Sequence, residues 1–362
     1  MRPIACYVHI PFCRSICPYC DFPKVYYRSD WADSYLDRLL LELSDCPHSE
    51  FKTLYFGGGT PTALPLDGLV KALKAFSLRL SPGGEFSVEG NPESFTPELC
   101  QALSESGVNR VSIGAQSSDG KLLGTLGRTH RFSDVERAVD NLLSAGISNI
   151  NLDLIYAAPG ESVDEARRDA ERFALLPITH LSSYSLILEQ GTCYSAEGIK
   201  EASQDDQAEQ FLTIRDALEA GGFRQYEVSS FQRGGHECAH NKEYWKGRHY
   251  LGFGMGASGF LPNGHYRNTR SLSRYLRLGP CPEFDPESAK DRIEEYLLTN
   301  LRLLEGFELS EFESLFGAEA LQSLRIKAAK PISEGILKEE SGRLFPTKDG
   351  ILLLDSALVD LF

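Results

Sequence analysis

The sequence predicts an α/β fold, a partial or full (β/α) TIM-like barrel, followed by a smaller C-terminal part. Two observations predict this fold class. In residues 1–225, apolar runs of strand length alternate with stretches that have the apolar spacing of helices. From residue 226 onward this alternation ends, and helical patterns return only near the end of the chain. Strands separated by helices indicate βαβ units with parallel pairing, but periodicity alone does not distinguish a barrel from an open doubly wound sheet.

The first part of the chain contains six predicted strands, and each is a short apolar run: 5–10, 53–56, 86–89, 111–114, 151–155 and 181–188. Six predicted helices lie between or after them: 31–43, 66–80, 97–106, 133–145, 163–175 and 204–220. Thr96 followed by Pro97 is a helix start signal, because proline suits the first helical position. Gly107 and Gly146 follow two of these helices and are typical helix ends.

Residues 226–362 form the predicted second domain. Residues 234–266 are rich in glycine, histidine and aromatic side chains and are too irregular for one regular element. Helical patterns return over 289–304, 309–315 and 318–329, followed by a strand, a turn and a strand over 335–347 and an apolar helix to Phe362. This order predicts a winged-helix-like module. Its last helix carries Asp355 and Asp360 but no Lys or Arg, which argues against nucleic-acid recognition.

The charge balance and the apolar pattern exclude other classes of protein. The 362 residues include 51 Asp and Glu against 37 Lys and Arg, a formal charge of −14. An acidic chain is a poor candidate for phosphate contacts, so we expect no nucleic-acid partner. No apolar run approaches the ~20 residues that a transmembrane helix needs, and the first residues lack a signal-peptide pattern. We therefore expect a cytoplasmic protein.

Three of the nine cysteines, Cys13, Cys17 and Cys20, crowd directly after the first predicted strand. In α/β barrels, the loops after the strands carry the chemistry. Three thiolates can hold three corners of a [4Fe–4S] cube and leave the fourth iron open. The alternative is a zinc site completed by His9 or His48, but the C-x3-C-x2-C spacing is not the usual zinc-binding pair.

The C-x3-C-x2-C spacing, with the aromatic Tyr19 before the last cysteine, resembles the signature of the radical S-adenosylmethionine (SAM) superfamily. In that superfamily the amino and carboxylate groups of SAM chelate the open iron. Residues 57–62, GGGTPT, follow the second predicted strand, where glycines let the backbone approach a ligand closely. They resemble the branch that contains anaerobic coproporphyrinogen III oxidase.

The resemblance to this branch implies a set of SAM-binding residues, most of them at the ends of predicted strands. Taken singly, each could have a structural role, since Asp153 could cap a helix, Arg128 could be a surface cation and Gln116 could tie a loop. The set implied for the SAM on the cluster, with the aromatic residue of the motif, is Tyr7, Tyr19, Gly58 and Glu89. The set implied for a second SAM position is Gly59, Thr60, Gln116, Arg128 and Asp153.

Phe22 separates this chain from the porphyrinogen oxidases of the branch, which carry a fourth cysteine at its position. Instead, the second half resembles the HemW family of haem chaperones, through an H-N-x-x-Y-W motif at 240–245 and the glycine-rich residues 250–257. One departure is Ser258, where HemW-like chains usually have histidine. The resemblance therefore extends over a radical SAM barrel domain, 1–225, and a C-terminal domain, 226–362.

The HemW resemblance implies a haem chaperone that binds a SAM-ligated [4Fe–4S] cluster and passes haem to an acceptor protein, with an electron donor for the cluster. His240 is the expected haem ligand, since imidazole suits iron, and Tyr244 and Trp245 could stack on the macrocycle. Cys238 and His236 are alternative ligands, and all these groups could equally knit an interface by hydrogen bonds. A radical enzyme acting on a porphyrin is the alternative function.

Overall fold

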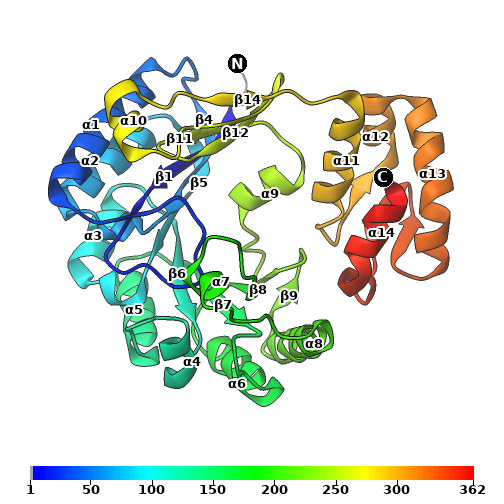
Figure 1. Ribbon diagram of the computed structural model, residues 1–362, viewed down its shortest axis with the longest axis horizontal. Helices are drawn as coiled ribbons and strands as arrows, with labels where there is room; N and C mark the ends of the chain where they lie inside the picture. The colour runs from blue at the N-terminus through cyan, green and yellow to red at the C-terminus, as the bar shows by residue number, and fades with distance from the viewer. Residues whose placement is uncertain (1–2) are drawn as a thin grey trace.

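A mixed sheet of twelve strands organises most of residues 3–362, the part of the chain that the computed structural model describes (Figure 1). Its central strands are parallel, and each contains all or most of one predicted run. In spatial order they are β1 (Ile4–Ile10), β4 (Phe51–Gly58), β5 (Leu80–Gly90), β6 (Arg110–Gln116), β7 (Asn149–Tyr156) and β8 (His180–Ser185). In the described sheet β1 and β8 are not neighbours, so the predicted barrel is partial rather than closed.

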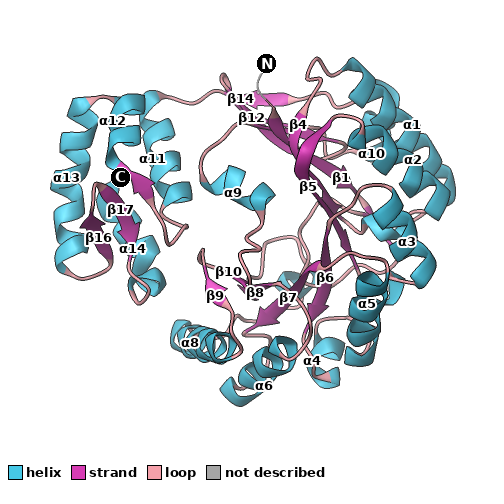
Figure 2. Ribbon diagram, turned by 180° about the vertical axis from the view of Figure 1, so that it is seen from behind, coloured by secondary structure: helices cyan, strands magenta, loops and turns pink. Residues whose placement is uncertain are grey.

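Helices cover the outer face of the curved sheet, as Figures 1 and 2 show. They are α1 (Ser29–Asp45), α2 (Leu66–Ser77), α3 (Pro97–Glu105), α4 (Gly120–Thr125), α5 (Phe132–Ser144), α6 (Val163–Ala174) and α8 (Gln204–Ala220). The predicted start of α3 is confirmed, because the Thr96 side chain accepts a hydrogen bond from the Leu99 amide. Gly107 and Gly146 have φ of +89° and +86°, as expected after helix ends. Over residues 3–362 no helix has the length and apolar character needed to cross a bilayer.

Both edges of the sheet are extended by short strands that the sequence did not predict. Beyond β8 lie β10 (Ser230–Gln232) and β9 (Arg224–Gln225). Beyond β1 lie β11 (Tyr250–Phe253), β12 (Ser258–Leu261), β13 (Gly264–Arg267) and β14 (Glu283–Asp285). Only β11 is parallel to its inner neighbour, and the other edge strands are antiparallel. Residues 234–266, expected to be too irregular for one regular element, thus supply β11, β12 and most of β13.

The expected division between residues 225 and 226 falls inside this sheet, because β9 ends at Gln225 and later strands still belong to the same sheet. A separate hydrophobic core begins at Tyr296 and extends to Leu361. It is built by α11 (Ala289–Asn300), β15 (Phe307–Glu308), α12 (Leu309–Phe316), α13 (Ala318–Ser333), β16 (Leu337–Glu340), β17 (Arg343–Pro346) and α14 (Leu354–Leu361). We call residues 289–362 the C-terminal module, and its element order is the expected winged-helix-like one.

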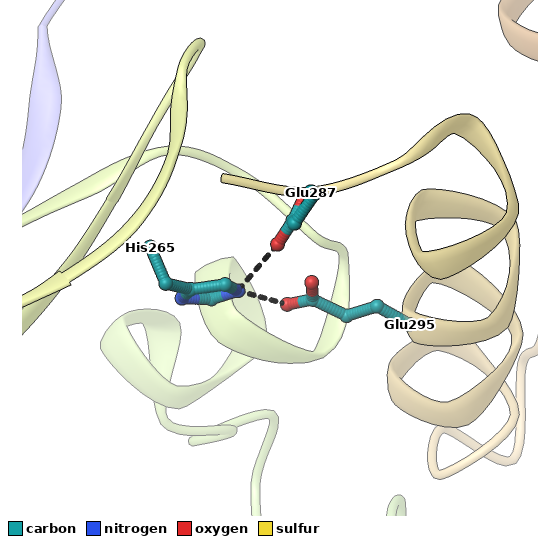
Figure 3. A group of neighbouring side chains, drawn as sticks. All are labelled: His265, Glu287 and Glu295. Atoms are coloured by element: carbon teal, nitrogen blue, oxygen red, sulfur yellow. Dashed lines mark hydrogen bonds and ion pairs between the residues drawn. The ribbon is translucent and has the colours of Figure 1, made fainter. Parts of the chain in front are cut away.

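One polar contact joins the C-terminal module to the edge of the sheet. His265 of β13 faces Glu295 of α11 and Glu287, which lies in the segment between β14 and α11 (Figure 3). Nε2 of His265 lies 2.7 Å from Oε1 of Glu295 and 3.0 Å from Oε1 of Glu287. This cluster therefore links the two parts of the molecule.

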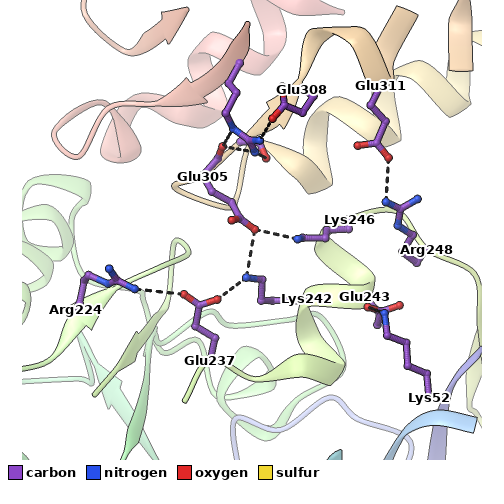
Figure 4. Close-up of polar contacts among 12 residues, drawn as sticks. Lys52, Arg224, Glu237, Lys242, Glu243, Lys246, Arg248, Glu305, Glu308 and Glu311 are labelled. Atoms are coloured by element: carbon purple, nitrogen blue, oxygen red, sulfur yellow. Dashed lines mark hydrogen bonds and ion pairs between the residues drawn. The ribbon is translucent and has the colours of Figure 1, made fainter. Parts of the chain in front are cut away.

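A second set of contacts runs through the short helix α9 (Ala239–Trp245), which stands between the sheet and the C-terminal module (Figure 4). Nζ of Lys242 and Nζ of Lys246 lie 3.2 and 3.1 Å from a carboxylate oxygen of Glu305. On the other side, Glu243 of the helix pairs with Lys52 of β4 at 2.8 Å. The remaining short helices are η1 (Pro61–Ala63), η2 (Pro92–Ser94), α7 (Cys193–Ala196), α10 (Leu272–Leu278) and η3 (Gly350–Leu353).

Candidate functional site

A cavity of about 450 Å³ opens where the parallel strands β1 and β4–β8 end. Its wall contains most of the residues that the sequence assigned to the cluster and to SAM. The assigned residues on the wall are Cys13, Cys17, Tyr19, Cys20, Gly58, Gly59, Thr60, Glu89, Gln116, Arg128 and Asp153. Tyr7, His240, Tyr244 and Trp245 are not among its lining residues.

The three cysteines lie on one loop that is held at both ends. Cys13 ends the two-residue strand β2 (Phe12–Cys13), which pairs with β3 (Val25–Tyr26). The amide of Cys20 donates to the carbonyl of Cys17 at 3.2 Å, which makes a turn. All three thiols are free of disulfides. Burial raises the pKa of the Cys13 and Cys20 thiols, and a positive ligand such as iron would favour their thiolate forms.

The spacing of the three sulfur atoms does not fit a single zinc ion. Thiolates that share one zinc at ~2.3 Å lie about 3.8 Å apart. In the described chain these three sulfurs do not all lie within 4.8 Å of one another. Neither suggested fourth ligand, His9 or His48, lines the cavity. Both ring nitrogens of His9 are also engaged, because they are hydrogen-bonded to Tyr7 and to the Pro23 carbonyl.

Glycines let the chain turn tightly beside the cysteine loop. Gly58 has φ of +106°, and a Cβ there would lie 2.3 Å from the ring of His9. A Cβ at Gly59 would lie 2.7 Å from the carbonyl oxygen of Ile10. Since neither position accepts a side chain without a clash, the backbone itself forms this part of the wall.

Glu89, at the end of β5, is a buried carboxylate that lines the cavity. Its Oε1 accepts a hydrogen bond from the Tyr55 hydroxyl at 2.7 Å, and its Oε2 accepts one from the Gly58 amide at 3.1 Å. Burial, with the nearby Asp153 carboxylate as a further cause, raises the pKa of Glu89 to about 7. A cationic ammonium group placed beside Glu89 would restore its negative charge.

Two other lining residues carry polar atoms with no partner among residues 3–362. These atoms are Oε1 of Gln116 and Nε of Arg128. The other guanidinium nitrogens of Arg128 donate to Asn91 Oδ1 at 2.8 Å and to the Tyr19 hydroxyl at 2.9 Å. Because buried polar atoms normally have partners, unpaired atoms beside a cavity indicate that a polar ligand completes the site.

Comparison with known proteins agrees with this geometry. The sequence profile described as the radical SAM superfamily matches residues 7–173, and that of the HemN C-terminal domain matches residues 288–353. The protein named heme chaperone HemW from Lactococcus lactis is 36% identical, over 97% of this chain and 95% of that protein. The Escherichia coli protein of the same name is 32% identical, over 100% of this chain and 98% of its own length. The chain belongs to the HemW family of radical SAM proteins.

The solved structure of coproporphyrinogen III oxidase, HemN, from Escherichia coli has the same fold. It superposes with a TM-score of 0.86 at 21% sequence identity, over 99% of this chain and 90% of that one. The fold class expected from the sequence is therefore confirmed, including the C-terminal module. The start of the HemN C-terminal domain match, at residue 288, coincides with the start of this module.

The cavity fits the two cofactors of the superfamily, a [4Fe–4S] cluster and SAM. When bound, the cluster would coordinate SAM through its open iron and would be able to supply it with an electron. The residues present can hold both groups: Cys13, Cys17 and Cys20 offer three thiolates, and Glu89 offers a carboxylate for an ammonium group. Thr60 donates a hydrogen bond to Sγ of Cys13 at 3.6 Å, which stabilises a thiolate at this position.

Tyr7 differs from its expected place on the cavity wall. Its hydroxyl is hydrogen-bonded to Nδ1 of His9 at 3.0 Å, and its ring stacks on Tyr55 at 6.2 Å. Tyr55 in turn holds Glu89. Tyr7 therefore contacts the site indirectly, through Tyr55, which lines the cavity.

His240 is fully buried and engaged on both sides of its ring. Nδ1 lies 2.8 Å from Oγ1 of Thr53, and Nε2 lies 2.6 Å from the hydroxyl of Tyr244. The ring also stacks on Tyr55 at 5.0 Å. Burial, and then the charge of Arg110, lowers the pKa of His240 to about 3, so the imidazole is neutral. In this conformation neither nitrogen is available to a haem iron.

Most of the other residues considered for haem are also engaged within the protein or lie outside the cavity. Trp245 packs under the guanidinium of Arg302, which lies 4.5 Å from the centre of the indole ring. Cys238 is buried, and Ser258, at the start of β12, lies outside the cavity wall. His236 is also outside the cavity wall. From the H-N-x-x-Y-W motif, only Asn241 reaches the cavity.

Several wall residues were not expected from the sequence, although a signal for them exists. Alternate residues of β6 and β7 face the cavity, and many are polar: Arg110, Ser112, Gly114 and Gln116, then Asn151, Asp153 and Ile155. Side chains alternate between the two faces of a strand, so Gln116 and Asp153 already predict that their partners at i−2 line the cavity. Tyr55 and Asn91 also line the cavity, but no comparable sequence pattern predicts them.

Proposed function

We propose that this chain is a haem chaperone, which binds haem and a SAM-ligated [4Fe–4S] cluster and transfers haem to an acceptor protein. The main supporting observation is that relatives named heme chaperone HemW match over nearly the whole chain, at 36% identity in one case. The motif also supports it, because Phe22 stands where the porphyrinogen oxidases have a fourth cysteine. The proposal includes a cytoplasmic location and a reductant for the cluster.

Within this function, the proposed roles of the wall residues follow the sequence assignment. Cys13, Cys17 and Cys20 hold the cluster, and Glu89 with Gly58 binds the amino group of the first SAM. A second SAM position is proposed for another part of the wall, lined by Gly59, Thr60, Gln116, Arg128 and Asp153. The unpaired atoms of Gln116 and Arg128 support this position.

The mouth of the cavity is the place that best suits haem. Phe22, Tyr184 and Ile187 line it with exposed fractions of 62%, 43% and 62%. Exposed apolar side chains around a cavity favour a flat apolar ligand, since each Å² of apolar surface removed from water contributes about 25 cal/mol. Haem ligation by His240 remains the alternative, and it would require the ring to leave Thr53 and Tyr244.

The proposal is tested with the anaerobic, cluster-loaded chain. Titration with haem, followed by the Soret band, should saturate near one haem per chain. Mixing the haem-loaded chain with apomyoglobin should then transfer haem in a single saturable phase. Free haem at the same concentration is the control. Absence of saturable binding would remove the haem chaperone proposal.

A radical enzyme acting on a porphyrin is the second candidate. It is favoured by the unpaired polar atoms of Gln116 and Arg128, which suit a site for chemistry as well as for binding. An anaerobic reaction with reductant, SAM and coproporphyrinogen would then give 5′-deoxyadenosine in proportion to a decarboxylated product. If SAM cleavage is independent of the porphyrinogen and no such product forms, this candidate is removed.

A further inference from the structure

A second cluster of ligand-type side chains lies outside the cavity, at the junction of the sheet and the C-terminal module. It consists of His265, Glu287 and Glu295, and one ligand atom of each lies within 4.8 Å of the others (Figure 3). The three residues come from β13, from the segment before α11 and from α11 itself. The fold therefore brings together three groups that are separated in sequence.

The geometry of the cluster is that of ligands on adjacent positions around one ion. Nε2 of His265 lies 2.7 Å from Glu295 Oε1 and 3.0 Å from Glu287 Oε1. Two ligand atoms at ~2.1 Å from a metal and at right angles are about 3 Å apart. Figure 3 shows both carboxylate oxygens facing Nε2 of His265. A small displacement of each group would admit an ion between them.

The charge of the cluster is unbalanced without a cation. Two carboxylates share one imidazole, and Oε1 of Glu287, whose side chain is only 11% exposed, lies 3.0 Å from Nε2 of His265 without the alignment of a hydrogen bond. A neutral imidazole and two carboxylates would carry a net charge of −2, which matches a divalent ion.

We propose that His265, Glu287 and Glu295 bind a divalent transition-metal cation that fastens the C-terminal module to the edge of the sheet. An imidazole nitrogen with carboxylate oxygens suits Zn²⁺ or Mn²⁺, whereas Mg²⁺ and Ca²⁺ prefer oxygen ligands alone. This inference does not depend on haem or on the cluster.

The surroundings of the site provide one further acidic group and one cation. Asp285 of β14 lies directly opposite His265 in the strand register, and its charge acts on His265. Arg292 of α11 acts on Glu287 and also on His249. Arg292 reduces the negative charge around the site without being one of its three ligands.

A cation here would act on the cavity through a chain of contacts. It would hold α11 against β13, and α11 in turn contacts α9. Asn241 of α9 lines the cavity, and Lys242 of α9 pairs with Glu305 of the C-terminal module. Fixing α11 would therefore also fix the wall of the cavity that α9 supplies.

The test uses the anaerobic, cluster-loaded full chain, in which the oxidised cluster is EPR-silent and occupies the cysteines. Titration with Mn²⁺, followed by the EPR signal of free Mn²⁺, should show one saturable site per chain that Zn²⁺ displaces. Glu287→Gln and Glu295→Gln, which keep the side-chain shape, should each weaken Mn²⁺ binding by about tenfold or more. Glu294→Gln removes the adjacent carboxylate of the same helix, which pairs with Lys290, and should change binding less than twofold.

Two outcomes would overturn the proposal. One is the absence of saturable Mn²⁺ and Zn²⁺ binding in the wild-type chain, which would leave an ion pair only. The other is equal binding in all three variants, which would place the ion elsewhere. A supporting second measurement is thermal unfolding, in which Zn²⁺ should raise the Tm of the wild-type chain and of Glu294→Gln but not of Glu295→Gln.

Discussion

The cavity wall and the helix α9 both carry polar side chains that the sequence assigned to ligands, but the two regions differ in how those side chains are satisfied. On the wall, Gln116 and Arg128 have buried atoms without partners in the described chain. In α9, both nitrogens of His240 are hydrogen-bonded within the protein. A buried group that lacks a partner indicates a missing ligand, whereas a satisfied one indicates a structural role.

The largest expected effect concerns the cysteine loop. Cys17→Ser removes one of three ligands, so the iron content should fall from about four per chain to near zero. Iron analysis and visible absorbance of the anaerobically prepared protein measure this. Cys193→Ser, an exposed cysteine of α7 outside the cavity, is the matched control and should keep the full iron content. An intact cluster in Cys17→Ser would contradict the assignment.

The next effect concerns stability. His240→Ala would leave the hydroxyls of Thr53 and Tyr244 without their partner and would open a void, so the free energy of unfolding should fall by about 2–4 kcal/mol. Denaturant unfolding of the cluster-free chain measures it. His249→Ala, at an exposed histidine, should cost less than about 1 kcal/mol. Equal costs for the two variants would remove the distinction between a structural and a ligand histidine.

A smaller effect is expected for the second SAM position. Arg128→Ala removes two hydrogen bonds of the wall and the unpaired Nε, and should weaken binding of the second SAM about tenfold or more. Calorimetric titration of the cluster-loaded chain with SAM would resolve the two sites. Arg131→Ala, at an exposed arginine three residues away, should leave both affinities unchanged. Loss of the first site in Arg128→Ala would reassign the residue.

The last effect is a pH dependence. Glu89 has its pKa raised to about 7 in the folded chain, while an unfolded glutamate has a pKa of ~4.3. The folded chain therefore binds the extra proton, and stability falls as the pH rises from about 4.3 to 7. Glu89→Gln should make this fall shallower, by about 1 kcal/mol per pH unit, in denaturant unfolding of the cluster-free chain. An unchanged slope would show that Glu89 is charged without a ligand.

The central strands could be predicted because each is a buried apolar run separated from the next by a helix of ordinary length. The edge strands β11–β14 could not, because they are at most four residues long and their pairing depends on distant residues. Gly252 illustrates this, since a Cβ there would lie 2.0 Å from the Ser258 carbonyl oxygen of the adjacent strand. No local sequence pattern predicts such a contact.

The candidate site also has parts that the sequence predicts and parts that it does not. The cysteine loop and the glycine segment are local motifs, and the cavity gathers them as expected. His240 also belongs to a local motif, but its burial depends on Thr53 and Tyr55, which lie far away in the sequence. A motif therefore predicts which residues matter, whereas the direction in which a side chain faces is decided by tertiary packing.

Haem titration of four chains tests most directly whether haem binds at the mouth of the cavity or at His240. The double variant Phe22→Asp and Ile187→Asp should raise the haem dissociation constant about tenfold or more, because it places charges on the apolar mouth. Folded His240→Ala should bind haem like the wild-type chain, as should Leu175→Asp, the control at an exposed leucine of the outer surface. Loss of haem binding in His240→Ala, with normal binding in the mouth variant, would contradict the account.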